Sequence, residues 1–218
     1  MKVFFFGDSI CFGQYVSPHK TWVTQIAREL DKLPGGENIQ VMNASVNGNT
    51  TRMALERMPY DVQSHSPDII LIQFGVNDCN YWKSDRGHPR VSKMGFKANL
   101  IEIIERSRIF GAKEIFLNTN NPSPKTSPFD YAPLSFQQSN EEFNQIIREV
   151  AKVTHVNLID IEKYWLEQFE KGLRLQDLLL PDNIHLSIPG HNLYFEIVYP
   201  YIEKAVKRLL RIEAQEKK

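Results

Sequence analysis

Residues 2–10 read Lys2-Val3-Phe4-Phe5-Phe6-Gly7-Asp8-Ser9-Ile10. The four bulky apolar residues from Val3 to Phe6, closed by a glycine, predict a short strand buried on both faces, which is typical of parallel sheets. Gly7 permits a sharp turn because it adopts backbone angles that other residues resist. Such a turn would lift Ser9 off the strand end into the crevice where open α/β sheets place their chemistry. Ser9 is therefore our candidate nucleophile, although Asp and Ser after a strand are also residue types that begin a helix.

The rest of the chain alternates short apolar runs with segments of helical periodicity. Further strands are expected at 39–42, 69–74, 115–117 and 156–159. Helices are expected at 21–30, from about Thr50, around 96–110, at 135–153, over much of 164–180 and at 189–212. Pro59 is expected to end the helix that begins near Thr50. This βαβ alternation, without an internal repeat, predicts an α/β fold in a single domain over residues 1–218.

Composition narrows the classes of partner and compartment. The 26 basic and 26 acidic residues cancel, which argues against a nucleic-acid or anionic-membrane partner. Two cysteines, Cys11 and Cys79, are too few for a disulfide framework and lack zinc-binding spacing. No run approaches the roughly 20 apolar residues of a membrane helix, so we expect a soluble, cytoplasmic protein, unless an export signal has been removed. The oligomeric state stays open.

Three strands that should end at the same sheet edge are each followed by a distinctive polar turn. These turns contain Gly7-Asp8-Ser9, Asn47-Gly48-Asn49 and Gly75-Val76-Asn77-Asp78. A fourth polar segment, Asp182-Asn183-Ile184-His185, precedes the last helix. Because loops at the carboxyl ends of parallel strands converge on one crevice, we expect these four pieces to meet.

Together the four pieces supply the parts of an acyl-transfer site. A serine hydroxyl is a poor nucleophile until a base removes its proton, and His185, with a reference pKa of about 6.5, suits that task near neutral pH. Asp182, three residues earlier, is close enough to orient the imidazole. The backbone N–H groups of Ser9 and Gly48 and the side-chain amide of Asn77 are the expected oxyanion donors.

On these residues the sequence resembles the SGNH hydrolase superfamily, also called the GDSL esterase/lipase superfamily. Its four blocks, which carry Ser, Gly, Asn and His, match the four polar segments in order, and the resemblance covers nearly the whole chain. It implies a three-layer α/β/α sandwich with a five-stranded parallel sheet, and ester hydrolysis without a metal or other cofactor. The chain departs from the family where it has Leu186 after His185, in place of a common proline, and Ser45 in place of an earlier glycine.

Two long loops, 79–92 and 120–133, are expected on the same rim as Ser9. Both are mostly polar, and four prolines make the second a shaped loop. Their aromatic residues are the candidate substrate contacts: Tyr81, Trp82, Phe129 and Tyr131. Neither loop offers an apolar run for a long acyl chain, so we expect a small ester substrate with a short acyl group, such as an acetylated carbohydrate. Tyr15 lies beside the same rim, whereas Trp22, at helical spacing, is expected in the core.

Several alternatives stay open. A lysophospholipase or a thioesterase would use the same fold. A metal-dependent phosphoesterase could draw its ligands from Asp8, Asp78, Asn77, Asp182 and His185, although no metal-ligand spacing supports it. A binding module without activity would not need an intact Ser9, Asp182 and His185. The family's strand order would make Cys11 and Cys79 neighbours beside the site, and whether they pair is open.

Overall fold

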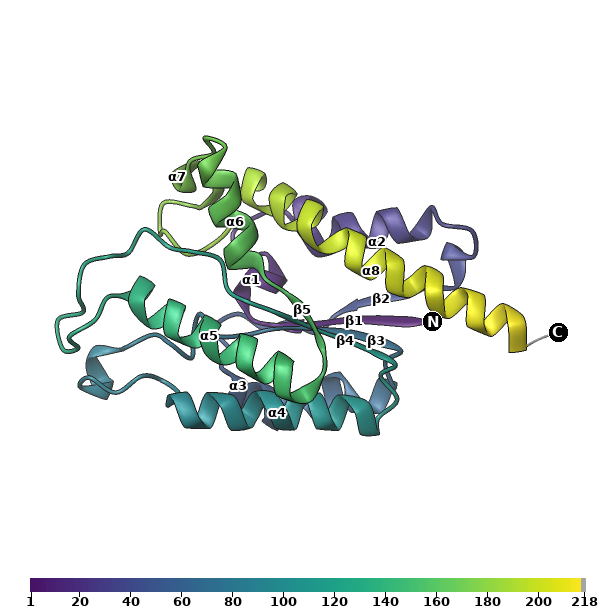
Figure 1. Ribbon diagram of the computed structural model, residues 1–218, viewed down its shortest axis with the longest axis horizontal. Helices are drawn as coiled ribbons and strands as arrows, with labels where there is room; N and C mark the ends of the chain where they lie inside the picture. Colours follow the sequence, from purple (N-terminus) through teal and green to yellow (C-terminus); the bar gives the residue numbers. More distant parts are fainter. Residues whose placement is uncertain (217–218) are drawn as a thin grey trace.

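The computed structural model describes residues 1–216, which form a parallel sheet between two layers of helices (Figure 1). Its strands lie in the order β2-β1-β3-β4-β5. They are β1 (Lys2–Gly7), β2 (Gln40–Asn43), β3 (Ile69–Gln73), β4 (Glu114–Asn118) and β5 (Asn157–Ile159). All four neighbouring pairs are parallel. The expected α/β sandwich with a five-stranded parallel sheet is confirmed.

The central strands are apolar because helices cover both faces of the sheet. Every residue of β3 is buried, as are Val3 to Gly7 of β1. Helices α2 (Trp22–Asp31), α6 (Ile161–Glu170) and α8 (Ile188–Glu216) lie on one face. Helices α3 (Thr51–Asp61), α4 (Lys93–Ile109) and α5 (Phe136–Thr154) lie on the other. The short helices α1 (Ser9–Phe12) and α7 (Leu175–Leu178) lie near the carboxyl ends of the strands.

Local sequence explains where the long helices begin. Thr50, Ser92, Ser135 and Asp160 each accept a backbone N–H of the first turn of α3, α4, α5 and α6. At α5 the Gln138 side chain also accepts the Ser135 N–H, which completes a reciprocal capping box. These caps set the residue at which each loop at the carboxyl edge of the sheet ends and its helix begins.

One helix expectation needs correction. Pro59 does not end its helix: α3 continues to Asp61, and Pro59 is exposed on its last turn, where water can satisfy the carbonyl that loses its N–H partner. The segment 164–180 is mostly helical, as expected, and it is divided into α6 and α7 because Gly172 takes a left-handed φ of 95° just after α6. Within residues 1–216 no helix is long and apolar enough to cross a membrane.

Candidate active site

Ser9 is the first residue of α1, directly beyond the end of β1. Asp8 caps this helix, because its Oδ1 accepts the Ile10 N–H at 2.9 Å. Gly7 is needed for close packing, since a Cβ on it would lie 2.7 Å from the Gln73 carbonyl oxygen. Asp8 thus supplies the cap, which leaves the Ser9 hydroxyl available at the carboxyl edge of the sheet.

The turn from Asp182 to His185 brings an imidazole to Ser9. Asp182 Oδ1 accepts the backbone N–H groups of Ile184 and His185, both at 3.0 Å. Its Oδ2 lies 2.5 Å from His185 Nδ1, and His185 Nε2 lies 2.9 Å from Ser9 Oγ. Asn183 takes a left-handed φ of 63°, a conformation that asparagine tolerates better than most residues, so the turn can fold back on itself. A continuous chain of hydrogen bonds therefore runs from the carboxylate to the hydroxyl.

The charge of Asp182 is fixed by its hydrogen bonds. Burial opposes ionisation, but the bonds from the His185 ring and backbone and from the Ile184 backbone outweigh it and hold the pKa of Asp182 below its ordinary value. The carboxylate is therefore ionised at neutral pH. An ionised Asp182 keeps the Nδ1 proton on His185 and leaves Nε2 as an acceptor for the Ser9 hydroxyl.

The turns after β1, β2 and β3 meet beside this chain of hydrogen bonds. Val46 N–H donates to the Gly7 carbonyl at 3.1 Å, which ties the second turn to the first. Asn77 Nδ2 donates to the Asn49 carbonyl at 3.1 Å, which ties the third turn to the second. Gly48 has a left-handed φ of 74° and open space where a Cβ would lie. The structure brings the expected oxyanion donors to one edge of the sheet, and their catalytic role stays a prediction.

Two buried carboxyl groups lie behind these turns. Asp78 Oδ1 accepts the backbone N–H and the hydroxyl of Thr51, at 2.9 and 2.5 Å. Within the described part of the chain, Oδ2 of Asp8 and Oδ2 of Asp78 are buried without a hydrogen-bond partner. Burial raises the pKa of Asp8 to about 8 and that of Asp78 to about 6. Their bonds to backbone N–H groups agree with structural roles for both residues.

Asp8→Asn is expected to stabilise the protein increasingly as the pH rises. The pKa of Asp8 is about 8 in the folded protein and 3.8 without the fold, so folding retains a proton that the unfolded chain loses. The stability contributed by this proton is complete below about pH 4 and falls as the pH rises toward about 8. Asparagine has no such proton to lose. Urea unfolding of both proteins at about pH 4 and about pH 9 measures the difference, and a difference independent of pH would contradict the assignment.

The four aromatic residues expected at the rim do not form one cluster. Tyr81 and Phe129 pack against each other, with ring centroids 5.0 Å apart. Trp82 is exposed and lies under the guanidinium of Arg90, 3.9 Å from its carbon to the ring centroid. Tyr131 is half-buried where the two loops touch. The loops themselves reach the site.

Side-chain hydrogen bonds connect both rim loops to the site. Arg90 Nη1 donates to the Gly48 carbonyl at 3.3 Å. The Ser123 hydroxyl donates to the Asn183 carbonyl at 2.7 Å, in the turn that carries the imidazole. The loop 79–92 is therefore tied to the turn that carries Gly48, and the loop 120–133 to the turn that carries His185.

Tyr15 contacts the chain of hydrogen bonds directly. Its ring packs edge-on against the His185 ring, with centroids 5.3 Å apart, and it is 74% exposed. Its φ of 67° is rare for a residue with a Cβ, and such backbone strain often occurs at functional sites. Its position six residues after Ser9 was the one signal of this role in the sequence. Trp22 is buried, as expected, and its indole N–H donates to the Ile10 carbonyl.

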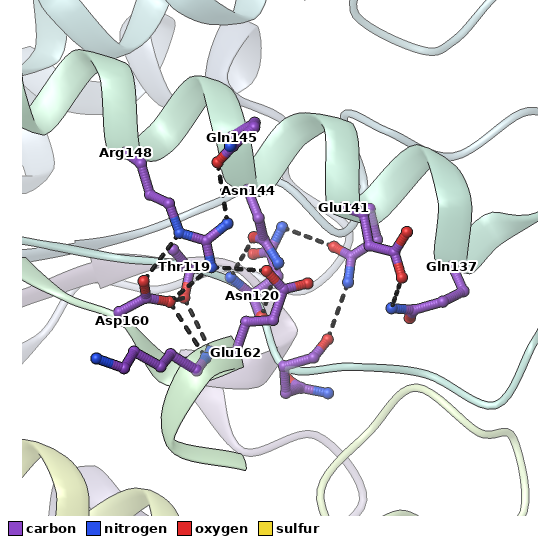
Figure 2. Close-up of polar contacts among 12 residues, drawn as sticks. Thr119, Asn120, Gln137, Glu141, Asn144, Gln145, Arg148, Asp160 and Glu162 are labelled. Carbon is purple, nitrogen blue, oxygen red and sulfur yellow. Dashed lines mark hydrogen bonds and ion pairs between the residues drawn. The ribbon is translucent and has the colours of Figure 1, made fainter. Parts of the chain in front are cut away.

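A buried amide network supports the start of the 120–133 loop (Figure 2). Asn120 N–H donates to Asn144 Oδ1 at 2.7 Å, and Asn144 Nδ2 donates back to the Asn120 carbonyl at 3.1 Å. Farther along α5, Arg148 bonds Asp160 and Glu162 at 2.7 to 2.8 Å, which fastens α5 to the start of α6. The loop that touches the histidine turn therefore leaves β4 from a rigid base.

The residues of the alternative metal site bond within the protein. Asp8 and Asp78 bond backbone N–H groups, and Asp182 bonds His185. Among the described residues no group of three or more His, Cys, Asp or Glu could hold a metal ion. Cys11 and Cys79 are free, buried thiols, and burial raises the pKa of each. That their sulfurs lie close together stays a prediction.

The chain is similar to a known protein family and to individual proteins of known sequence or structure. A family model described as the GDSL-like Lipase/Acylhydrolase family matches residues 5–193. The "Uncharacterized lipoprotein YqeF" of Bacillus subtilis is 29% identical over 176 residues, which cover 73% of this chain and 72% of that protein. Esterase TesA of Pseudomonas aeruginosa is 24% identical over 198 residues, covering 90% and 85%. The crystal structure of Axe2, an acetylxylan esterase from Geobacillus stearothermophilus, shares the fold with a TM-score of 0.72 at 22% identity, over 90% of this chain and 91% of that one.

Proposed function

The chain belongs to the GDSL-like lipase/acylhydrolase family and is a carboxylic ester hydrolase of that type, and from this premise we propose that it works through a covalent acyl-enzyme on Ser9. The observation that carries the proposal is the hydrogen-bonded chain of Asp182, His185 and Ser9, with distances of 2.5 and 2.9 Å. Hydrolysis of p-nitrophenyl acetate by the wild-type chain and by a Ser9→Ala variant tests it. We propose further that residues 1–218 form one catalytic domain.

The first half-reaction forms the acyl-enzyme. Ser9 Oγ attacks the ester carbonyl while His185 Nε2 takes the hydroxyl proton, and Asp182 stabilises the imidazolium that results. The negative charge that develops on the carbonyl oxygen is stabilised by N–H groups of Ser9, Gly48 and Asn77. Asn77 has two amide N–H groups, and the proposed oxyanion donor is the one that does not bond the Asn49 carbonyl. When the intermediate collapses, the imidazolium gives its proton to the leaving alcohol.

The second half-reaction regenerates the enzyme. His185 takes a proton from a water molecule, and the resulting hydroxide equivalent attacks the acyl carbon bound to Ser9. The same N–H groups stabilise the second oxyanion, and His185 returns the proton to Ser9 Oγ as the carboxylic acid leaves. Each turnover therefore consumes one ester and one water and releases one alcohol and one acid.

The proposed substrate is a short-chain ester with a polar alcohol. A cavity of about 370 Å³ adjoins the histidine turn, where aromatic and hydroxyl side chains face the same space. Its lining includes Phe129, Phe136, Thr126, Ser127 and Asn183. An aromatic ring beside hydroxyl groups suits a sugar, which has apolar C–H faces and polar edges. The acetylxylan esterase that shares this fold supports an acetylated carbohydrate as the natural substrate class.

A lysophospholipase or thioesterase is the second candidate, and one observation favours it. Phe12, Tyr15 and Val46 are 49%, 74% and 42% exposed on the segments that carry Ser9 and Gly48. Exposed apolar side chains beside a nucleophile could hold an acyl chain, since each buried methylene contributes about 0.8 kcal/mol. The two candidates differ in the acyl length that they prefer.

We expect acetyl and propionyl p-nitrophenyl esters to be hydrolysed with higher kcat/KM than octanoyl and longer esters. The reason is that the two rim loops are polar and offer no continuous apolar groove. Steady-state kinetics over the acyl series measures this preference, with correction for the spontaneous hydrolysis of each ester. A kcat/KM that climbs steadily to the decanoyl ester would favour the lipid candidate and the three exposed apolar residues as its contacts.

A cytoplasmic location stays our proposal, based on the two free thiols. One relative is named a lipoprotein. The balanced charge supports our proposal that the protein binds a small-molecule ester and binds neither nucleic acid nor a membrane.

A further inference from the structure

Arg57, on α3, joins the ends of two neighbouring strands at the site. Its Nη1 donates to the Ala44 carbonyl at 2.5 Å, and its Nη2 donates to the Gly7 carbonyl at 3.1 Å. Its Nε donates to Asn49 Oδ1 at 2.6 Å. The guanidinium also lies 4.5 Å from the ring centroid of Phe6, and the side chain is only 17% exposed. Besides its ion pair with Asp61 on its own helix, this planar group therefore bonds three acceptors from two separate segments at the site.

These three acceptors flank the two backbone donors of the proposed oxyanion hole. The Gly7 carbonyl lies at the end of β1, two residues before Ser9. Ala44 directly follows β2, and Asn49 directly follows Gly48. The distance between the Ser9 N–H and the Gly48 N–H depends on how these two strand ends are held relative to each other, and Arg57 binds both.

Side-chain packing does not fix Gly48 in place. No heavy atom lies within 4 Å of the position that a Cβ would occupy, and the residue has a left-handed φ of 74°. Glycine turns of this kind have wide backbone freedom. Hydrogen bonds must restrict it, namely the bond from Arg90 to the Gly48 carbonyl and the bonds to the neighbouring residues. Asn49, the next residue, is held through its side chain by Arg57 and through its carbonyl by Asn77.

We propose that Arg57 is a positioning residue that sets the separation of the two backbone donors, so that the oxyanion hole is complete only with this guanidinium in place. The proposal rests on the proposed acyl-enzyme mechanism. Arg57 acts through the Gly7, Ala44 and Asn49 acceptors and not on the ester itself. Lysine could not replace it, because a single ammonium lacks the planar arrangement of donors that reaches three acceptors at once.

Arg57→Ala is expected to lower kcat for p-nitrophenyl acetate by about 10- to 100-fold, with KM changed by less than about threefold, because a displaced donor weakens binding of the transition state more than that of the ester. Active sites are counted by titration with a serine-directed phosphonofluoridate, and kcat is calculated per titrated site. A loss of folded protein therefore does not lower the measured kcat. Millimolar guanidinium chloride should restore part of the lost kcat in the variant and not in the wild type. Arg57→Lys keeps the charge and most of the volume, and we expect it to lose about tenfold in kcat.

Arg106→Ala is the matched control. Arg106 makes an i,i+4 ion pair with Glu102 on α4, as Arg57 does with Asp61 on α3, but its bonds reach no strand end. We expect its kcat to stay within about twofold of the wild type. Wild-type kcat per titrated site in both Arg57 variants would overturn the proposal. If Ser9→Ala is inactive in the same assay, that result leaves the proposed function standing, whereas an active Ser9→Ala variant would overturn the proposed function itself.

Discussion

Ser9→Ala is expected to lower kcat for p-nitrophenyl acetate by about ten-thousandfold or more, with the protein still folded. The hydroxyl is the atom that bonds to the acyl group, and alanine leaves His185 without a proton to take. The residue is 4% exposed, and removal of its hydroxyl costs the fold one hydrogen bond, which that hydroxyl donates to His185 Nε2 at 2.9 Å. The loss should therefore appear in kcat and not in the thermal midpoint.

Variants of nearby residues test whether the loss of activity is specific to the Ser9 hydroxyl and its base. His185→Ala should lose nearly as much, and the double variant with Ser9→Ala should be little worse than either, because the two side chains act as one unit. Ser187→Ala is the matched control. It removes a serine hydroxyl two residues after His185, and this hydroxyl bonds the Asp177 carbonyl and not the imidazole. We expect that control to keep most of its activity. A Ser9→Ala variant that retains more than about a tenth of wild-type kcat would rule out the acyl-enzyme mechanism.

Asn77→Ala is expected to lower kcat by about a hundredfold to a thousandfold with little change in KM. An oxyanion donor meets its full negative charge only in the transition state, so its removal leaves ester binding almost unchanged. Part of the loss would come from the Asn49 carbonyl, which accepts from Asn77 Nδ2 and would lose that partner. Kinetics of the variant with p-nitrophenyl acetate measures both constants.

Asn80→Ala controls for disturbance of the same loop. The Asn80 side chain also bonds locally, through Oδ1 to the Tyr81 N–H at 2.8 Å, but it makes no hydrogen bond to the three turns at the site. We expect its kcat within about twofold of the wild type. A raised KM with unchanged kcat in Asn77→Ala would instead mean that this amide binds the ester in the ground state.

The parts of the fold that short-range patterns control were predictable from the sequence. The buried strands were visible as apolar runs, and their order along the chain implied a parallel sheet. The contact between Asp182 and His185 was also predictable, because a separation of three residues in a turn leaves the two side chains little freedom to separate. The meeting of Ser9 with His185 followed from the convergence of loops at one sheet edge.

Features that depend on tertiary contacts were not visible. Arg57 looked like any polar residue of a helix, because its three acceptors are backbone and side-chain atoms from segments far away in the sequence. The left-handed backbone of Tyr15, which brings its ring to His185, has no glycine or asparagine to indicate it. Pro59 misled because the rule for proline describes helix interiors, and this proline lies on a last exposed turn.

The most direct test of the central claim is the site of covalent labelling by a serine-directed phosphonofluoridate. Tryptic digestion of the inactivated protein should yield peptide 3–20, which contains both Ser9 and Ser17. Fragmentation distinguishes the two serines by mass. We predict one adduct per chain, on Ser9, formed in proportion to the loss of activity and equally fast after prolonged EDTA treatment. Complete inactivation with Ser9 unmodified, or full activity with Ser9 fully modified, would contradict the account.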